Sequence, residues 1–155
     1  MLESIERVHW DAYRQPSNDE NAVPKALRAL AFASTEVEAH DAYGALLDAV
    51  GRDHAGTYYP VVVPAIGFIG EIIDAGGPHA RRYALEALTD LVWSFEPEPG
   101  FEKINNELGR EVGLQAAVKQ AGARLAPLIR QAAQRADNEP AVAQLARHLL
   151  ELLAN

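Results

Sequence analysis

Three prolines in this chain are each followed by a leucine at nearly the same distance, and this repeated spacing limits the folds that the chain can adopt. Each lies inside a predicted helix and is followed, 22 to 24 residues later, by a leucine in a second predicted helix. The pairs are Pro24 with Leu46, Pro64 with Leu88, and Pro127 with Leu150. A two-helix unit that recurs about every 40 residues is typical of an α-solenoid, in which neighbouring units must stack to bury their apolar sides. The wider gap between the second and third prolines predicts an insertion there.

The composition also favours helices. Among the 155 residues are 28 alanines and 17 leucines, both strong helix formers, and no alternating apolar pattern lasts long enough to predict a sheet. We therefore predict an all-α fold: a short right-handed α-solenoid of about three helix pairs behind an N-terminal helical cap. An irregular helical bundle is the alternative.

Turn signals divide this single predicted domain, 1–155, into segments. Proline and glycine clusters interrupt the helical patterns and mark where each unit ends. A long helix is predicted over 114–136 with Pro127 inside it, and the weak periodicity of 101–113 is compatible with a short helix. The predicted segments are the cap 1–20, repeat 1 over 21–51, repeat 2 over 60–95, an insertion or linker over 96–113, and repeat 3 over 114–155.

Several stretches together resemble a known family. They are Val23-Pro24-Lys25-Ala26-Leu27-Arg28-Ala29-Leu30, His54-Ala55-Gly56-Thr57-Tyr58-Tyr59-Pro60 and Val63-Pro64-Ala65-Ile66-Gly67-Phe68-Ile69, preceded by Trp10. The chain resembles small bacterial HEAT-repeat proteins, which are armadillo-like α-solenoids. Some members of that group look like immunity proteins encoded beside secreted toxins. The resemblance therefore implies HEAT-like helix pairs and a protein-binding role.

The charge is unevenly distributed along the chain. Residues 1–109 carry 18 acidic and 8 basic side chains, and the whole chain has a net charge of −8. On the second helices of the first two predicted pairs, the polar positions repeat at helical spacing and include a tryptophan, a residue typical of interface anchors. These stripes predict an acidic concave protein-binding surface, with an ordinary solvated face as the alternative. Its candidate residues are Glu38, Asp41, Asp48, Glu86, Asp90 and Trp93.

The loop between the first two pairs is the most distinctive local feature. Its candidate residues are Asp53, His54, Gly56, Thr57 and Tyr59. We interpret the loop as a structural clasp in which Gly56 permits an unusual backbone angle, His54 and Thr57 bond the loop backbone, and a tyrosine packs between repeats. An acid–base or ligand cluster around His54 is the alternative, because histidine titrates near neutral pH.

Motifs for other functions are not found. The chain has no cysteine, no pair of histidines at metal-binding spacing, no phosphate-binding glycine loop and no nucleophile elbow. We assign no catalytic residue, metal or cofactor, and the acidic balance argues against nucleic-acid binding. The longest run without a charged side chain, which contains 58–70, is too short to span a bilayer, and the first residues lack the apolar core of a signal peptide.

These observations predict a cytoplasmic protein-binding module that is a monomer or a weak dimer. The leading hypothesis is an immunity protein of a toxin–antitoxin type of system, which covers a basic toxin domain with its acidic surface. The alternatives are a scaffold or adaptor for a partner that is not a toxin, and a small enzyme centred on the His54 loop.

Overall fold

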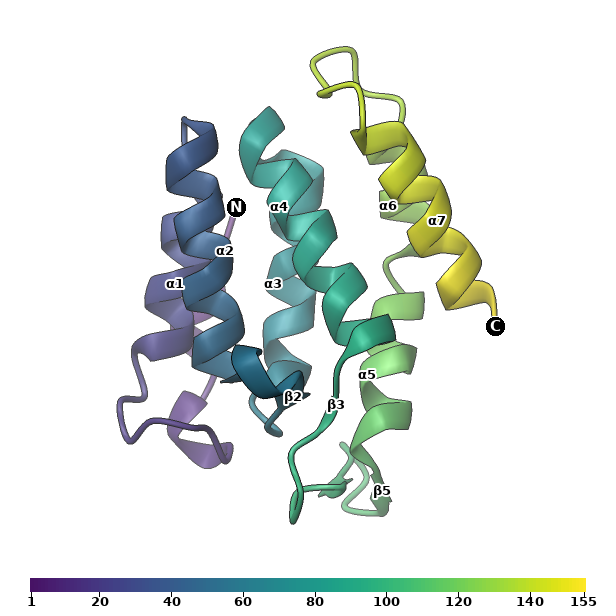
Figure 1. The fold of residues 1–155 in the computed structure, drawn as a ribbon. Coiled ribbons are helices and arrows are strands. Elements are labelled where there is room, and N and C mark those ends of the chain that lie inside the picture. Colours follow the sequence, from purple (N-terminus) through teal and green to yellow (C-terminus); the bar gives the residue numbers. More distant parts are fainter.

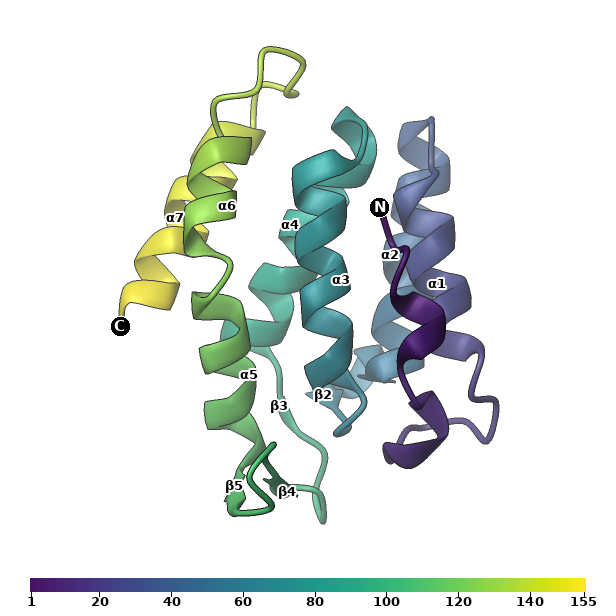
Figure 2. The same ribbon diagram turned by 180° about the vertical axis from the view of Figure 1, so that it is seen from behind.

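Seven α-helices make up most of the protein and form two layers. In the computed structural model, which describes residues 1–155, α2 (Glu36–Val50), α4 (Pro78–Thr89) and α7 (Val142–Ala154) lie side by side in one layer, which we call the front layer (Figure 1). The other layer contains α1 (Ala22–Ala31), α3 (Val62–Ala75), α5 (Leu114–Ala123) and α6 (Ala126–Ala132), as the view from behind shows (Figure 2). The mostly helical character predicted from the composition is confirmed. None of the helices is both long enough and apolar enough to cross a membrane.

Within each pair of helices, the chain crosses from one layer to the other. α1 leads into α2, α3 into α4, and α6 into α7, and the two helices of each pair pack against each other. The central helix, α3, contacts α1, α4, α5 and α6, which explains why apolar residues occupy nearly all of its sides. The apolar core therefore lies between the two layers and runs through all three pairs of helices.

Local signals in the sequence explain where the helices of the front layer begin. The hydroxyl of Thr35 accepts a hydrogen bond from the backbone N–H of Glu38 at 3.1 Å, which caps α2. Pro78 is the first residue of α4, where its missing N–H costs no hydrogen bond. The last turn beyond α4 is a π-helix over Asp90–Ser94, in which the N–H of Phe95 reaches back to the carbonyl of Asp90 at 2.9 Å.

Two small sheets interrupt the helical fold, which the sequence did not predict. In the first, β1 (Gly51–Arg52) pairs antiparallel with β2 (Thr57–Tyr58), and β2 pairs parallel with β3 (Glu96–Pro97). In the second, β4 (Lys103–Asn105) and β5 (Glu111–Gly113) form a hairpin, so a helix within 101–113 is wrong. Strands of two or three residues are too short to produce a recognisable alternating pattern.

The long helix predicted over 114–136 is also wrong. α5 ends at Ala123, and α6 begins at Ala126 after a short break. Pro127 has no N–H to donate to the carbonyl of Ala123, and its ring would clash with that carbonyl in a continuous helix. The break therefore begins where the proline first interferes. It directs Leu125 toward α3, where the side chain occupies the space beside Gly70.

The N-terminal segment, predicted as a helical cap over 1–20, forms two 3₁₀ turns, Ile5–Arg7 and Trp10–Ala12. It lies against α1 and α3 on the side away from the front layer, in the foreground of Figure 2. The indole N–H of Trp10 donates to the carbonyl of Ile5 at 3.0 Å, and its ring lies 5.9 Å from the ring of Phe68 in α3. Trp10 thus attaches this segment to the central helix.

A buried arginine links the second and third pairs of helices. Arg81 in α4 is only 1% exposed, and its guanidinium donates to the carbonyls of Gly76 at 2.8 Å and Ile73 at 3.3 Å. It also donates to the side chains of Asp137 at 2.9 Å and Asn138 at 2.8 Å, in the loop before α7. One side chain therefore satisfies carbonyls at the end of α3 and holds the loop that positions α7.

Candidate functional site

The exposed side of α2, α4 and α7 is the candidate functional surface, and we call it the front face. Its three helices come from different parts of the chain but lie in one layer (Figure 1). The side chains exposed or partly exposed on these helices and on the π-helical turn include Glu36, His40, Asp41, Asp48, Arg82, Glu86, Trp93, Gln144 and His148.

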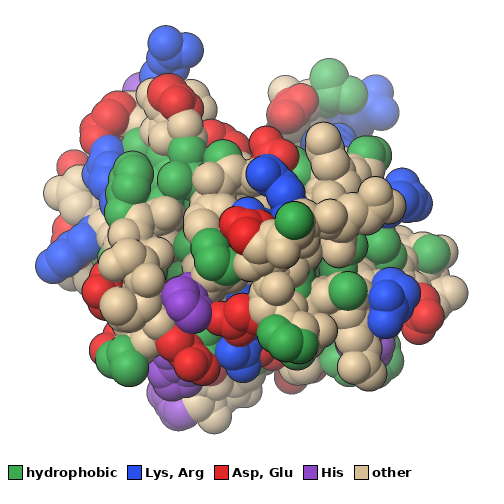
Figure 3. Space-filling model, turned by 90° about the horizontal axis from the view of Figure 1, so that it is seen from above, with side chains coloured by type: hydrophobic (Ala, Val, Ile, Leu, Met, Phe, Trp, Pro, Cys, Tyr) green, Lys and Arg blue, Asp and Glu red, His purple; other side chains and the backbone are tan.

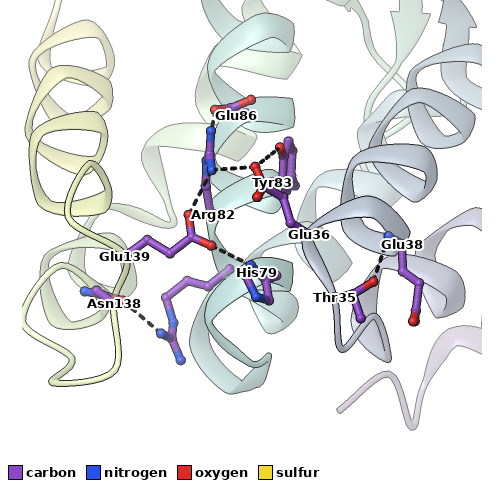
Figure 4. A network of polar contacts seen from close by, with 10 residues as sticks. Thr35, Glu36, Glu38, His79, Arg82, Tyr83, Glu86, Asn138 and Glu139 are labelled. Atoms are coloured by element: carbon purple, nitrogen blue, oxygen red, sulfur yellow. Dashed lines mark hydrogen bonds and ion pairs between the residues drawn. The ribbon is translucent and has the colours of Figure 1, made fainter.

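At one end of the front face, a polar network connects all three helices (Figure 4). Arg82 in α4 is its centre, with one terminal nitrogen 2.9 Å from Glu139 and 3.3 Å from Glu36, and Nε 3.5 Å from Glu86. Glu36 begins α2, and Glu139 lies just before α7. The network therefore ties both neighbours to α4.

Negative charge exceeds positive charge in this network. Three carboxylates surround the single guanidinium of Arg82, whose carbon also lies 4.9 Å from the centre of the Tyr83 ring. The hydrogen bond to Glu139 is the main reason that the pKa of Arg82 is raised, so this cation remains charged. Figure 3 looks onto this end of the molecule, where acidic, basic and histidine side chains are interleaved with apolar ones.

Three aromatic rings fill the middle of the front face between α2 and α4. The ring of His40 lies 5.5 Å from that of Tyr83, edge to face, and the ring of Tyr43 lies 5.7 Å from Tyr83. The hydroxyl of Tyr43 donates to the carboxylate of Asp90. Burial raises the pKa of both Tyr43 and Asp90, and the nearby carboxylate of Asp53 raises the pKa of Asp90 further.

Asp48 and Asp90, both candidates for the acidic surface, have different surroundings. Asp48 is exposed on α2, whereas Asp90 is half-buried and bonded to Tyr43. Reversing the charge of Asp90 would break an internal hydrogen bond, so it cannot test a surface contact alone. Asp48 is the cleaner position for such a test.

The π-helical turn after α4 presents a large exposed side chain. Leu91 and Val92 of this turn are buried, whereas Trp93 is 64% exposed. The first small sheet joins this turn to the end of α2, which brings Asp48, Asp53 and Glu96 to the same end of the front face. An exposed tryptophan therefore lies at the acidic end of the surface.

The remaining predicted surface residues either interact with nearby groups or are simply exposed. Glu38 belongs to the cap of α2, where its carboxylate lies 3.4 Å from the backbone N–H of Ser34. Glu86 is paired with Arg82, and Asp41 is exposed. Sequence reasoning missed Glu36 and Glu139 as partners of Arg82, because they are 46 and 57 positions away from it along the chain.

A groove separates α4 from α7 next to the Arg82 network. Its volume is about 310 Å³, and its lining residues are Arg82, Glu86, Ala141, Gln144, Leu145 and His148. No group of three or more histidine, aspartate or glutamate side chains in the protein is arranged to hold a metal ion.

The first small sheet and its side chains form a clasp, which we define as residues 51–59 together with 96–98. Gly56 has a φ of 67°, in the left-handed region that glycine adopts most easily. The buried hydroxyl of Thr57 donates to Glu98, and Arg52 lies 3.5 Å from the same carboxylate. Arg52 also donates to the hydroxyl of Tyr59 at 3.3 Å.

Two parts of the predicted clasp are wrong. His54 is exposed and makes no side-chain hydrogen bond, so it does not bond the loop backbone. The hydroxyl of Thr57 bonds the side chain of Glu98 and not the loop backbone. Asp53 and His54 begin a 3₁₀ turn that projects from the clasp. Tyr59, by contrast, packs its ring 4.9 Å from that of Phe101, beyond β3.

His54 and Thr57 are therefore expected to respond differently to substitution. His54→Ala should change the free energy of unfolding by less than about 0.5 kcal/mol, as exposed substitutions usually do. Thr57→Val preserves the shape of the side chain but removes the bond to Glu98, and should cost about 1–2 kcal/mol. Urea denaturation of both variants measures the difference. Equal losses would show that His54 supports the clasp in some way other than through hydrogen bonds.

No protein-family profile, no curated protein and no solved structure matches this chain.

Proposed function

We propose that the protein is a protein-binding module whose front face docks a basic partner, as an immunity protein docks on the toxin domain that it blocks. The observation that carries this proposal is Trp93, a large side chain that is 64% exposed at the acidic end of that face. Tryptophan is enriched among the residues that contribute most to protein–protein interfaces.

The position of Trp93 suits an anchor. The two residues before it, Leu91 and Val92, are buried, so the turn that carries the tryptophan is fixed to the core. A side chain held on a rigid element loses little conformational freedom when it binds. The carboxylates at the same end would attract a basic partner and raise its association rate, and this effect falls as salt increases.

We propose further that the three pairs of helices are a short right-handed α-solenoid of HEAT type. Two features support this: each pair packs against the next, and the second helix of every pair lies in the front layer (Figure 1). In this arrangement the front face is the concave side. The proposed module acts in the cytoplasm as a monomer or a weak dimer.

The first experiment identifies the partner and tests the surface together. The tagged protein and its variants are purified from the native cells at moderate salt, and the bound proteins are identified by mass spectrometry. A stoichiometric partner with a basic, toxin-like domain is expected. Affinity for that partner is then measured for Trp93→Ala and Asp48→Lys.

Trp93→Ala should weaken binding about thirtyfold, a loss typical of an anchor residue. Asp48→Lys should weaken it mainly through slower association, and more at low salt. Phe32→Ala is the matched control, because Phe32 is also aromatic and is 69% exposed, but lies in the turn between α1 and α2. Equal losses for Trp93→Ala and Phe32→Ala, or no loss for either, would remove the tryptophan from the interface.

A further inference from the structure

The groove between α4 and α7 combines apolar walls with a carboxylate. Ala141 and Leu145 provide the apolar walls, and Glu86, Gln144 and His148 provide polar atoms. At about 310 Å³, the groove is large enough for one long side chain but small for most organic ligands. Its two sides belong to helices that the Arg82 network holds together, so the groove is built into the fold.

The charges around this groove are not balanced. Arg82 and Glu86 both line the groove, and the further carboxylates of Glu36 and Glu139 lie against Arg82. Arg82 is shared among Glu36, Glu86 and Glu139, and Glu86 is its most distant partner, at 3.5 Å. Both carboxylate oxygens of Glu139 are engaged, one by Arg82 and the other by His79. Glu86 uses only one oxygen, and its second oxygen has no partner. A carboxylate in the wall of a partly apolar groove favours a cation beside it.

We infer that this groove binds the side chain of an arginine from the partner protein. The methylene groups would lie along Leu145 and Ala141, and the guanidinium would donate to Glu86 and to the amide oxygen of Gln144. Arginine fits better than lysine because its planar guanidinium can bond a carboxylate through two N–H groups and is less strongly hydrated. That this arginine belongs to a partner protein rests on the proposed function.

The side chain can be tested without the partner. The probe is N-acetyl-arginine amide, titrated into the full-length protein while the amide and methyl resonances of Ala141 and Leu145 are followed by NMR. Binding with a dissociation constant on the order of 1–10 mM is expected for a single exposed charge pair. The corresponding lysine amide should bind more weakly. The citrulline amide, which has nearly the same shape but no charge, should not bind.

Two variants locate the site. Glu86→Gln removes the charge while keeping the size of the side chain, and Ala141→Leu fills the groove without changing any charge. Both should abolish the shifts caused by the arginine probe. Glu107→Gln is the control, because it removes an exposed carboxylate between β4 and β5, away from the front face, and should leave the shifts unchanged. Thermal melting of each variant confirms that it remains folded.

Two results would overturn the inference. The first is equal shifts with the arginine and citrulline probes, or no shifts with either. The second is a response to arginine that survives both Glu86→Gln and Ala141→Leu. These results are separate from those of the partner experiment. If a partner binds through Trp93 but the groove does not bind the arginine probe, only the inference about the groove is rejected. If the groove binds the arginine probe but no partner is retained from the native cells, only the proposed function is rejected.

Discussion

Replacing Arg81 with methionine is expected to lower the free energy of unfolding by about 3–5 kcal/mol. Methionine keeps much of the length of the side chain but cannot donate hydrogen bonds. The carbonyls of Gly76 and Ile73 would lose their bonds from the guanidinium, and the loop at Asp137 and Asn138 would lose its attachment to α4. Buried carbonyls without a partner account for most of the expected loss.

Thermal and urea denaturation measure this effect, and for a chain of this size the melting temperature should fall by roughly 10 °C. Arg130→Met is the matched control, because Arg130 lies exposed on α6 and forms no ion pair. Its loss should stay below about 0.5 kcal/mol. If the two substitutions cost the same, the bonds of Arg81 contribute nothing beyond those of an ordinary surface arginine.

Replacing Gly51 with alanine should cost about 3 kcal/mol or more, because a side chain there meets backbone on the neighbouring strand. A Cβ at Gly51 would lie 2.0 Å from the carbonyl oxygen of Thr57 and 2.7 Å from the Cα of Tyr58. Neither atom can move without separating β1 from β2. The clasp should therefore open, and urea denaturation together with the amide NMR signals of residues 51–58 would show it.

Gly44→Ala supplies the matched control within α2. A Cβ at Gly44 meets no atom within 4 Å, and alanine is the better helix former. This substitution should stabilise the protein by about 0.5–1 kcal/mol. If the free energy of unfolding changes in opposite directions at these two glycines, only seven positions apart, then Gly51 is required by close packing, whereas Gly44 only adds flexibility to the unfolded chain. A stabilising Gly51→Ala would instead show that the two strands are not tightly paired.

Much of the helical layout was predictable because the physical signals are local. Pro78 and the glycines before it separate α3 from α4, and the run of alanine and leucine at helical spacing marks the buried sides. The exposure of Trp93 also followed from spacing, since it lies seven positions after Glu86. These features depend on residues within one or two turns of each other.

Other features depend on residues that are distant along the chain. The burial of Arg81 is decided by the loop at Asp137, 56 positions away. Nothing near Arg82 in the sequence distinguishes it from Arg81, yet one lies in the core and the other on the front face. Pro127 was a local signal for a break in the helix. The proline alone, however, does not show whether it lies within one long helix or in the first turn of a new one.

The parallel pairing of β2 with β3 has a mechanical consequence. Thr57 and Glu98, whose side chains are bonded across the clasp, are 41 positions apart along the chain, and all of α3 and α4 lies between them. Tension applied to the two chain ends would pull β2 from its first residue and β3 from its last, in opposite directions. The backbone hydrogen bonds from Glu96 to Gly56 and from Glu98 to Tyr58 would then be loaded together in shear. As long as these two bonds hold, the force would not pass through α3 and α4.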